Sequence, residues 1–242
     1  MSTDRVLVTG ATSPLGAAVS RRFHASGAKV GVHYRNAETV ALQLTEEIDG
    51  TALHANFDTD DVENVCEKLV RDFPANVFVL NASAQTVTPW ADLTVDAFDN
   101  MYRSSLRATA AMVFVAARHL MNSSDNNKVI VIVGSIEGIK PARNHAAYAT
   151  MKAALHHLVM AAAHELGGHG IRVVGVAPGL IHRDGLEKDW PEGVARWNQA
   201  AALGRPVTNE EVADAIHALA HNTGITGVTL PVDAGWSANP SW

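Results

Sequence analysis

The chain has 242 residues, of which 47% are hydrophobic and 18% are charged. These values are ordinary for a globular protein and suit one α/β domain with a single large core. The net charge of −6 is spread along the chain. It argues against nucleic acid as the main partner, because phosphate binding needs clustered lysines and arginines. Cys66 is the only cysteine, so an internal disulfide is excluded.

No segment of the sequence is expected to enter a membrane. The longest apolar runs, such as 110–117, are far shorter than the roughly 20 residues that span a bilayer. Residues Met1–Arg5 lead into a strand without the basic and long apolar segments of a signal peptide. Together with the single cysteine, these features predict a cytoplasmic protein with no membrane partner.

Short β-branched runs alternate with longer helical patterns along the chain. The predicted strands are 5–9, 29–34, 51–55, 77–81, 128–134, 172–177 and 229–232. The predicted helices are 14–26, 37–48, 60–72, 94–121, 146–167 and 209–220. Most of the strands are apolar on both faces, as expected of strands that helices cover on each side. The pattern predicts a single-domain (1–242) Rossmann-type α/β fold, a doubly wound sheet of about seven parallel strands with helices on both faces.

A glycine-rich turn follows the first strand, with the sequence Thr9-Gly-Ala-Thr-Ser-Pro-Leu-Gly16. Gly10 and Gly16 suit a tight turn, and Ser13 with Pro14 suits the N-cap and first position of a helix. We expect the amides of Leu15 and Gly16 to bind a phosphate of a dinucleotide, with Pro14 removing at most one donor. An ordinary strand-to-helix turn is the alternative.

The end of the second strand carries Tyr34 and Arg35, and no acidic residue precedes Glu38. A carboxylate at this place binds the ribose 2′-OH of NAD, whereas an arginine accommodates the 2′-phosphate of NADP. Arg35 therefore favours NADP(H) as the cofactor, and a solvated surface arginine is the alternative.

Tyr148 and Lys152 are spaced i, i+4, which places them on one face of a predicted helix. A free tyrosine has a pKa near 10, and a nearby ammonium group would lower it by stabilising the phenolate. Ser135 ends a strand, where its hydroxyl could polarise a carbonyl beside the tyrosine.

Together with the opening turn, these residues resemble the short-chain dehydrogenase/reductase family over essentially the whole chain. The shared motifs are Thr9-Gly10…Gly16, Asn81-Ala82, Ser135…Tyr148-x-x-x-Lys152, Pro178-Gly179, Leu203-Gly-Arg-Pro-Val-Thr208 and Ile225-Thr-Gly227…Val232-Asp-Ala-Gly235. The resemblance implies an NADP(H)-dependent oxidoreductase of the EC 1.1.1 type that reduces a carbonyl or oxidises the alcohol.

The resemblance also implies roles for individual residues. Tyr148 would be the general acid that protonates the substrate oxygen, Lys152 would lower its pKa and hold the nicotinamide ribose, and Ser135 would hydrogen-bond the carbonyl. Asn56 would lie near the adenine amine. The other implied cofactor-binding residues are Gly10, Thr12, Ser13, Leu15, Tyr34, Arg35, Asn36, Phe57, Asn81, Ala82, Ser83, Pro178, Gly179 and Ile181.

The chain departs from the family pattern at four positions. Pro14 and Ser83 stand where the family usually has glycines, and Arg183 replaces a threonine that commonly meets the carboxamide. Ser105 occupies the place of a catalytic asparagine that holds a relay water. Because a serine hydroxyl can bind a water, we expect a slower proton relay through Ser105 rather than none.

The substrate walls are predicted in Gln85–Trp90 and in a lid around 181–204. The candidate substrate-binding residues are Gln85, Trp90, Arg183, Trp190 and Trp197. The tryptophans would either contact a flat or ring-containing substrate or only pack the lid against the core. Arg183 would either bind an acidic group of the substrate or form a surface ion pair.

The sequence leaves two alternatives to a carbonyl reductase open. The segments 32–35 and 80–84 look similar to those of pteridine reductases, although Ser135 and Ser13-Pro14 differ from that group, which makes a pteridine-type reductase the minority interpretation. A protein that binds NADP(H) without turnover is the other. No histidine spacing suggests a metal site. The alanine-rich segment 146–163 and the helix before it imply a homo-oligomer, either a tetramer or a dimer.

Overall fold

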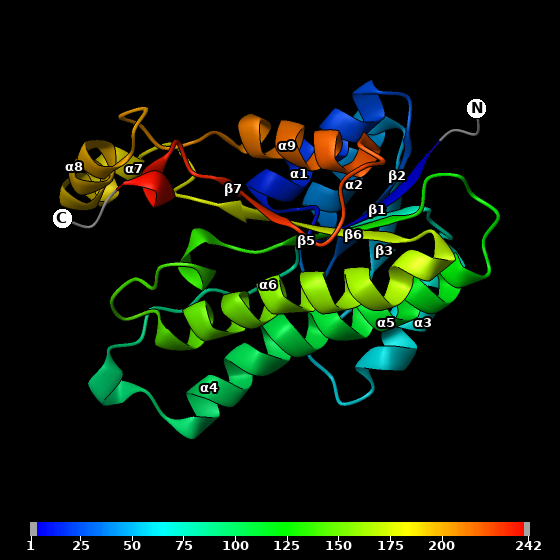
Figure 1. Ribbon diagram of the computed structural model, residues 1–242, viewed down its shortest axis with the longest axis horizontal. Coiled ribbons are helices and arrows are strands. Elements are labelled where there is room, and N and C mark those ends of the chain that lie inside the picture. The colour runs from blue at the N-terminus through cyan, green and yellow to red at the C-terminus, as the bar shows by residue number, and fades with distance from the viewer. Residues whose placement is uncertain (1–3, 240–242) are drawn as a thin grey trace.

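The computed structural model describes residues 4–239, so residues 1–3 and 240–242 lie outside the described part. Parallel strands form one seven-stranded sheet in the order β3-β2-β1-β4-β5-β6-β7 (Figure 1). The strands are β1 Arg5–Thr9, β2 Lys29–Tyr34, β3 Thr51–His54, β4 Val77–Leu80, β5 Val129–Val133, β6 Arg172–Pro178 and β7 Thr229–Val232. The predicted doubly wound sheet of seven parallel strands is confirmed.

Helices cover both faces of this sheet (Figure 1). The helices are α1 Pro14–Ala25, α2 Glu38–Ile48, α3 Val62–Asp72, α4 Val95–Met101, α5 Ala108–Met121, α6 Ala146–Leu166, α7 Leu186–Asp189, α8 Pro191–Ala200 and α9 Asn209–His221. Helices α1, α2 and α9 pack on one face, and α3, α5 and α6 pack on the other. Each face of the sheet therefore has its own apolar core.

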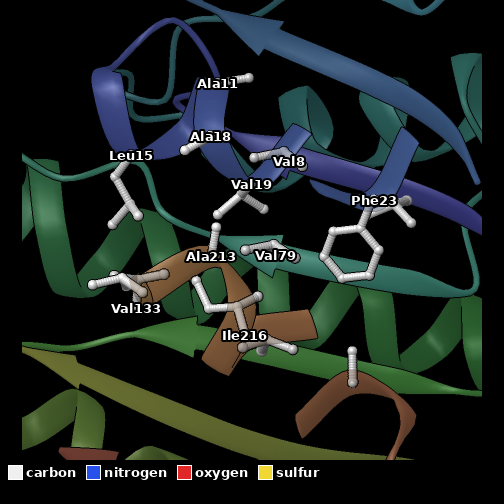
Figure 2. Close-up of a cluster of buried hydrophobic side chains, with 14 of the residues drawn as sticks. Val8, Ala11, Leu15, Ala18, Val19, Phe23, Val79, Val133, Ala213 and Ile216 are labelled. Atoms are coloured by element: carbon white, nitrogen blue, oxygen red, sulfur yellow. The ribbon is translucent and has the colours of Figure 1, made fainter. Parts of the chain in front are cut away.

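Strand residues divide between the two cores because successive side chains point to opposite faces. In β1, Val6 and Val8 face α1 and α9, whereas Leu7 faces the opposite layer. Figure 2 shows the first of these cores, where Phe23 and Val19 of α1 lie against Val79 of β4 and Ile216 of α9. Double-sided burial explains why the strands are apolar at nearly every position.

Two elements differ from the expectation. The long helix predicted at 94–121 is interrupted by a π-helical turn at Tyr102–Arg107, which separates α4 from α5. A π turn inserts one residue without breaking the hydrophobic periodicity on either side, so the pattern could not reveal it. The segment predicted as a lid contains α7 and α8, whose short lengths left no clear periodic signal.

The sheet positions the candidate site at the carboxyl ends of its strands. β1 lies between β2 and β4, so the connections leaving β1 and β4 diverge to opposite sides and open a crevice between them. Two cavities lie at this edge, one on each side of the β1 and β4 ends. Within residues 4–239, no helix has the length and apolar character that crossing a membrane requires.

Candidate active site

The turn after β1 has the tight geometry that its glycines predict. Gly10 adopts φ +62°, and a Cβ there would lie 2.9 Å from the Ala82 Cα. A Cβ at Gly16 would overlap the Gly10 carbonyl oxygen. Both glycines are therefore required for the close approach of α1 to the ends of β1 and β4.

Ser13 is the N-cap of α1 and Pro14 is its first residue, as the sequence predicts. Ser13 Oγ accepts a hydrogen bond from the Gly16 amide at 3.1 Å and donates to the Gly10 carbonyl at 2.9 Å. The expectation that the Gly16 amide is free is therefore wrong, because the cap uses it. Among residues 4–239, the Thr12 and Leu15 amides have no hydrogen-bond partner and remain for a ligand.

Asn81 braces this turn from β4. Its Nδ2 lies 3.1 Å from the Thr9 carbonyl oxygen, 3.0 Å from that of Gly10 and 3.2 Å from Ser13 Oγ. The family resemblance implied that Asn81 would lie beside the ribose of the cofactor. Asn81 does line the larger cavity, but its amide group is engaged by the turn.

His33 holds the turn from the other side, a role that the sequence did not reveal. The Gly10 amide donates to His33 Nδ1 at 2.9 Å, and His33 Nε2 lies 3.1 Å from the Ala55 carbonyl oxygen. Burial lowers the pKa of His33 to about 4, so the ring is neutral, with its proton on Nε2. His33 thus links the first strand, the second strand and the chain after the third.

The smaller cavity has a volume of about 320 Å³ and lies beside His33. Seven predicted cofactor-binding residues line it: Gly10, Thr12, Arg35, Asn36, Phe57, Ala82 and Ser83. Asp58 also lines this cavity, and its carboxylate lies 3.7 Å from Arg103 Nε. Arg35 is exposed and has no carboxylate partner among residues 4–239.

Tyr34 and Asn56, two of the residues predicted to bind the cofactor, do not line this cavity. Strand alternation turns Tyr34 to the α1 side of the sheet, where its hydroxyl lies 3.3 Å from Glu38 Oε1, and leaves His33 facing the cavity. Asn56 is exposed and accepts a hydrogen bond from the Asp58 amide through Oδ1. Neither side chain is placed to meet a ligand in the smaller cavity.

Ser135, Tyr148 and Lys152 come together in the larger cavity, at the ends of β5 and the start of α6. Lys152 is 2% exposed and donates to the Val133 carbonyl oxygen through Nζ at 3.0 Å. The same Nζ lies 5.4 Å from the centroid of the Tyr148 ring. The predicted serine–tyrosine–lysine group is therefore assembled from two separate elements.

Burial controls the proton affinities of this group. Burial raises the pKa of Tyr148 to about 12, although hydrogen bonding to Ser135 lowers it and the Glu137 charge raises it further. Burial also lowers the pKa of Lys152 to about 8, against the effect of Glu137. The expectation of a lowered tyrosine pKa is thus wrong for this structure, because desolvation of the phenol raises the pKa. Tyr148 is protonated at neutral pH and can act as a proton donor.

Ser105 lies in the π-helical turn and is fully buried. Its hydroxyl lies 3.4 Å from the Ala84 carbonyl oxygen and 3.5 Å from Met101 Sδ. It lines neither cavity. A relay water at Ser105 would therefore have to reach it through its neighbours.

The larger cavity has a volume of about 740 Å³. Besides Ser135, Tyr148 and Lys152, nine predicted residues line it: Leu15, Asn81, Ser83, Gln85, Pro178, Gly179, Ile181, Trp190 and Trp197. Trp197 stacks on Trp236 with ring centroids 5.4 Å apart and an angle of 1° between the planes. The C-terminal segment and the 181–204 segment thus form one aromatic wall.

Two predicted substrate residues lie away from this cavity. Trp90 is 77% exposed on a short turn, and Arg183 forms an ion pair with Asp189 at 2.7 Å. Arg196 of α8 lines the cavity instead. The sequence could not separate the two arginines, because the fold of α7 and α8 decides which one faces inward.

A half-buried pair also lines the larger cavity and was missed by the sequence analysis. His145 Nδ1 lies 2.7 Å from Glu137 Oε2, and the His145 ring meets the Tyr148 ring edge-on at a centroid distance of 6.3 Å. Glu137 also acts on the pKa values of Tyr148 and Lys152. Among residues 4–239, no group of three or more His, Cys, Asp or Glu side chains is placed to hold a metal ion.

The two cavities fit a nicotinamide dinucleotide. The crowded glycines at 10 and 16 bring backbone close to where a pyrophosphate would bind, and two free amides point from the turn. Ser83 lines both cavities and so marks their junction. This arrangement would hold the adenosine half in the smaller cavity and the nicotinamide half beside Tyr148.

Comparison with known proteins supports this assignment. A family described as "Enoyl-(Acyl carrier protein) reductase" matches residues 10–237. L-xylulose reductase of Bos taurus is 31% identical over 238 residues, covering 97% of this chain and 96% of that protein. Meso-2,3-butanediol dehydrogenase of Serratia marcescens is 28% identical over 244 residues, covering 97% of this chain and 94% of that protein.

The fold is shared as closely. The crystal structure of acetoin dehydrogenase from Enterobacter cloacae superposes with a TM-score of 0.88 at 27% identity, covering 100% of this chain and 98% of that one. The matches run along nearly the whole of these relatives, and Gly10, Asn81, Ala82, Ser135, Tyr148, Lys152, Pro178 and Gly179, which carry part of the resemblance, line the two cavities. The chain belongs to the short-chain dehydrogenase/reductase family of oxidoreductases.

Proposed function

We propose that this protein is an NADP(H)-dependent oxidoreductase that reduces a carbonyl group, or oxidises the corresponding alcohol. The observation that carries the proposal is the placement of Ser135, Tyr148 and Lys152 in one 740 Å³ cavity. The relatives named above are reductases or dehydrogenases, which supports the reaction type.

NADP(H) is favoured by the surroundings of the smaller cavity. Arg35 lines it and has no acidic partner among residues 4–239, so its guanidinium is available to a 2′-phosphate. The acidic residue that lines the cavity, Asp58, lies close to Arg103, which offsets its charge. A bidentate contact with Arg35 would distinguish NADPH from NADH.

The reaction divides between the cofactor and the chain. When bound, reduced nicotinamide supplies the hydride that reduces the carbonyl carbon. Tyr148 donates a proton to the carbonyl oxygen, which its high pKa permits at neutral pH. Ser135 donates a hydrogen bond to the same oxygen, and the Lys152 ammonium stabilises the phenolate that Tyr148 becomes.

The walls of the larger cavity indicate what kind of substrate fits. One wall is aromatic, with Trp190, Trp197 and Trp236. The other carries polar groups, among them Glu137, His145 and Gln85. A small carbonyl compound that also carries hydroxyl groups would meet both, and the xylulose and acetoin enzymes among the relatives act on compounds of this kind.

We also propose that the protein is a homo-oligomer. Phe114 of α5 is 51% exposed and Met160 of α6 is 50% exposed, although both helices bury other apolar side chains in the core. Burial of such side chains against a second copy would stabilise a dimer or tetramer. Sedimentation of the purified protein tests the oligomeric state.

The first experiment is a titration of the purified protein with NADPH and, separately, with NADH, followed by tryptophan fluorescence or heat. Clear NADPH binding with much weaker NADH binding is expected. Tighter NADH binding would overturn the cofactor assignment and leave the oxidoreductase in place, and no binding of either would favour an ordinary turn after β1.

A turnover assay with Tyr148→Phe then separates an enzyme from a protein that only binds the cofactor. L-xylulose, acetoin and a dihydropterin are suitable first substrates. The variant should keep its NADPH affinity and lose turnover, because the ring remains and only the proton donor is removed. Turnover of the dihydropterin alone would favour the pteridine-type reductase.

A further inference from the structure

His156 lies on α6 one helical turn after Lys152 and two turns after Tyr148, so the three side chains share one face of the helix. Its ring packs against the loop that carries Ser135. A Cβ at Gly134 would overlap His156 Nε2, and a Cβ at Gly138 would lie 2.7 Å from His156 Cε1. The two glycines that flank this loop therefore make room for the histidine ring.

The ring also contacts the backbone of Ser135. The Ser135 amide donates to His156 Nε2 at 3.4 Å, a long hydrogen bond, so packing against the glycines is the larger part of the contact. A ring nitrogen accepts only when it carries no proton, so neutral His156 has its proton on Nδ1. Because Ser135 and Tyr148 line the same cavity and Ser135 lowers the pKa of Tyr148, a shift of this backbone would move the serine hydroxyl relative to the phenol.

The protonation of His156 depends on its neighbours. Burial lowers the pKa of His156, and the charge of Lys152 on the same helix lowers it further. The other titratable groups around it are Tyr148 on α6 and Glu137 on the loop, whose carboxylate is bound to His145. The imidazole is therefore neutral at neutral pH and gains a proton only below its ordinary pKa of about 6.5.

We propose that His156 is a positioning residue for Ser135, holding the serine-bearing loop in place beside Tyr148 through its ring and its unprotonated Nε2. The proposal rests on the reaction proposed above and adds to it a residue with no direct contact with the substrate. A proton on Nε2 would face the Ser135 amide as a second donor. The loop would then shift, and turnover would fall in acid while NADPH affinity stayed the same.

The test compares His156→Leu, which removes the acceptor, with His156→Gln, whose amide oxygen can stand in for Nε2. His157→Leu is the matched control, because His157 is exposed on the same helix. We expect His156→Leu to lower kcat by about tenfold or more, as small displacements of reacting groups do, with NADPH affinity unchanged. His156→Gln should keep kcat within about threefold and lose the acid limb of the pH profile.

Two results would overturn the proposal. The first is a folded His156→Leu variant with wild-type kcat. The second is an acid limb in His156→Gln that matches wild type, since another group such as His145 would then cause it. If His156→Leu does not fold, the His156→Gln profile decides.

If the proposed function itself is wrong, the wild-type protein turns over none of the carbonyl substrates, which distinguishes this outcome from a failure of the His156 proposal. In that case the ring is examined directly by NMR of the ¹⁵N-labelled wild-type protein. A proton on His156 Nδ1 at neutral pH supports the contact with the Ser135 amide, and a proton on Nε2 overturns it.

Discussion

The side-chain oxygens of Ser83 and Ser105 lie 2.9 Å apart, so the two serines that depart from the family pattern touch each other. Ser83 lines both cavities, whereas Ser105 is fully buried behind it. Ser83 Oγ also lies 3.2 Å from the Ala84 carbonyl oxygen. The pair ties the chain after β4 to the π-helical turn and connects buried Ser105 to the cavities through one hydroxyl.

This contact predicts that Ser105→Asn is tolerated only with a smaller residue at position 83. The asparagine side chain is larger than serine and meets the Ser83 hydroxyl in a space with no exposure, so we expect a loss of about 1–3 kcal/mol in the free energy of unfolding. Ser83→Gly/Ser105→Asn should recover most of this loss. Urea unfolding of Ser105→Asn, Ser83→Gly and the double variant measures the coupling between the two positions. If the changes in the free energy of unfolding simply add, the predicted coupling is contradicted.

The same variants test the proton relay. If residue 105 takes part in proton transfer, the folded double variant should differ from wild type in turnover and in the pH dependence of turnover. Unchanged values in a folded variant would remove this position from the reaction.

Lys152→Met should stabilise the protein at neutral pH. A buried lysine whose pKa falls from 10.5 to about 8 favours the unfolded state by about 3 kcal/mol where both states are protonated. This penalty is fully present below pH 8 and disappears as the pH rises towards 10.5, because the unfolded state then also loses its proton. The lost hydrogen bond to Val133 offsets part of the gain.

Thermal unfolding of Lys152→Met and wild type between pH 7 and 10 measures this effect. The difference in melting temperature should shrink as the pH rises. A difference that grows with pH would contradict the assignment of a lowered lysine pKa. Turnover should be lost in the variant at every pH, because the variant lacks the Lys152 ammonium that stabilises the phenolate of Tyr148.

Arg35→Ala should weaken NADPH binding and leave NADH binding unchanged. A charge-assisted hydrogen bond contributes about 1.5–3 kcal/mol, which corresponds to a loss of roughly tenfold or more in affinity. Arg71→Ala is the matched control, since Arg71 is an exposed arginine on α3 beside Glu67. Equal losses for both cofactors would show that Arg35 does not contact the 2′-phosphate.

Arg196→Ala should raise KM for the best substrate by about threefold or more, because its guanidinium lines the larger cavity and offers several donors. Arg183→Ala should change KM by less than about twofold, because Arg183 pairs with Asp189 outside that cavity and surface ion pairs contribute little. Steady-state kinetics of the two variants decides between them. The reverse result would restore Arg183 as the substrate-binding arginine.

Much of the architecture could be predicted from local patterns. Ser13 at the N-cap with Pro14 after it set the start of α1, and Thr208 with Glu211 forms a capping box at the start of α9. These features depend on hydrogen bonds within a few residues, which the order of residues determines. The spacing of Tyr148 and Lys152 predicted one helix face for the same reason.

The electrostatics could not be predicted in this way. Tyr148 was expected to have a lowered pKa from the nearby lysine, yet the depth of both side chains decides the outcome. Arg183 and Arg196 lie in one segment, and only the packing of α7 and α8 turns Arg196 into the cavity. His33 faces the smaller cavity because successive side chains of β2 point to opposite faces of the sheet. Its hydrogen bond with the Gly10 amide joins residues far apart in the chain.

The sequence by itself determined the parallel sheet, the starts of the helices and the shared helix face of Tyr148 and Lys152, because periodicity, caps and i, i+4 spacing act over short distances. The tertiary structure decided the contacts of Ser83 with Ser105 and of His156 with Ser135, the pKa values and the walls of the cavities. These depend on burial and on side chains that come from separate strands and helices, and no local pattern encodes which of them meet.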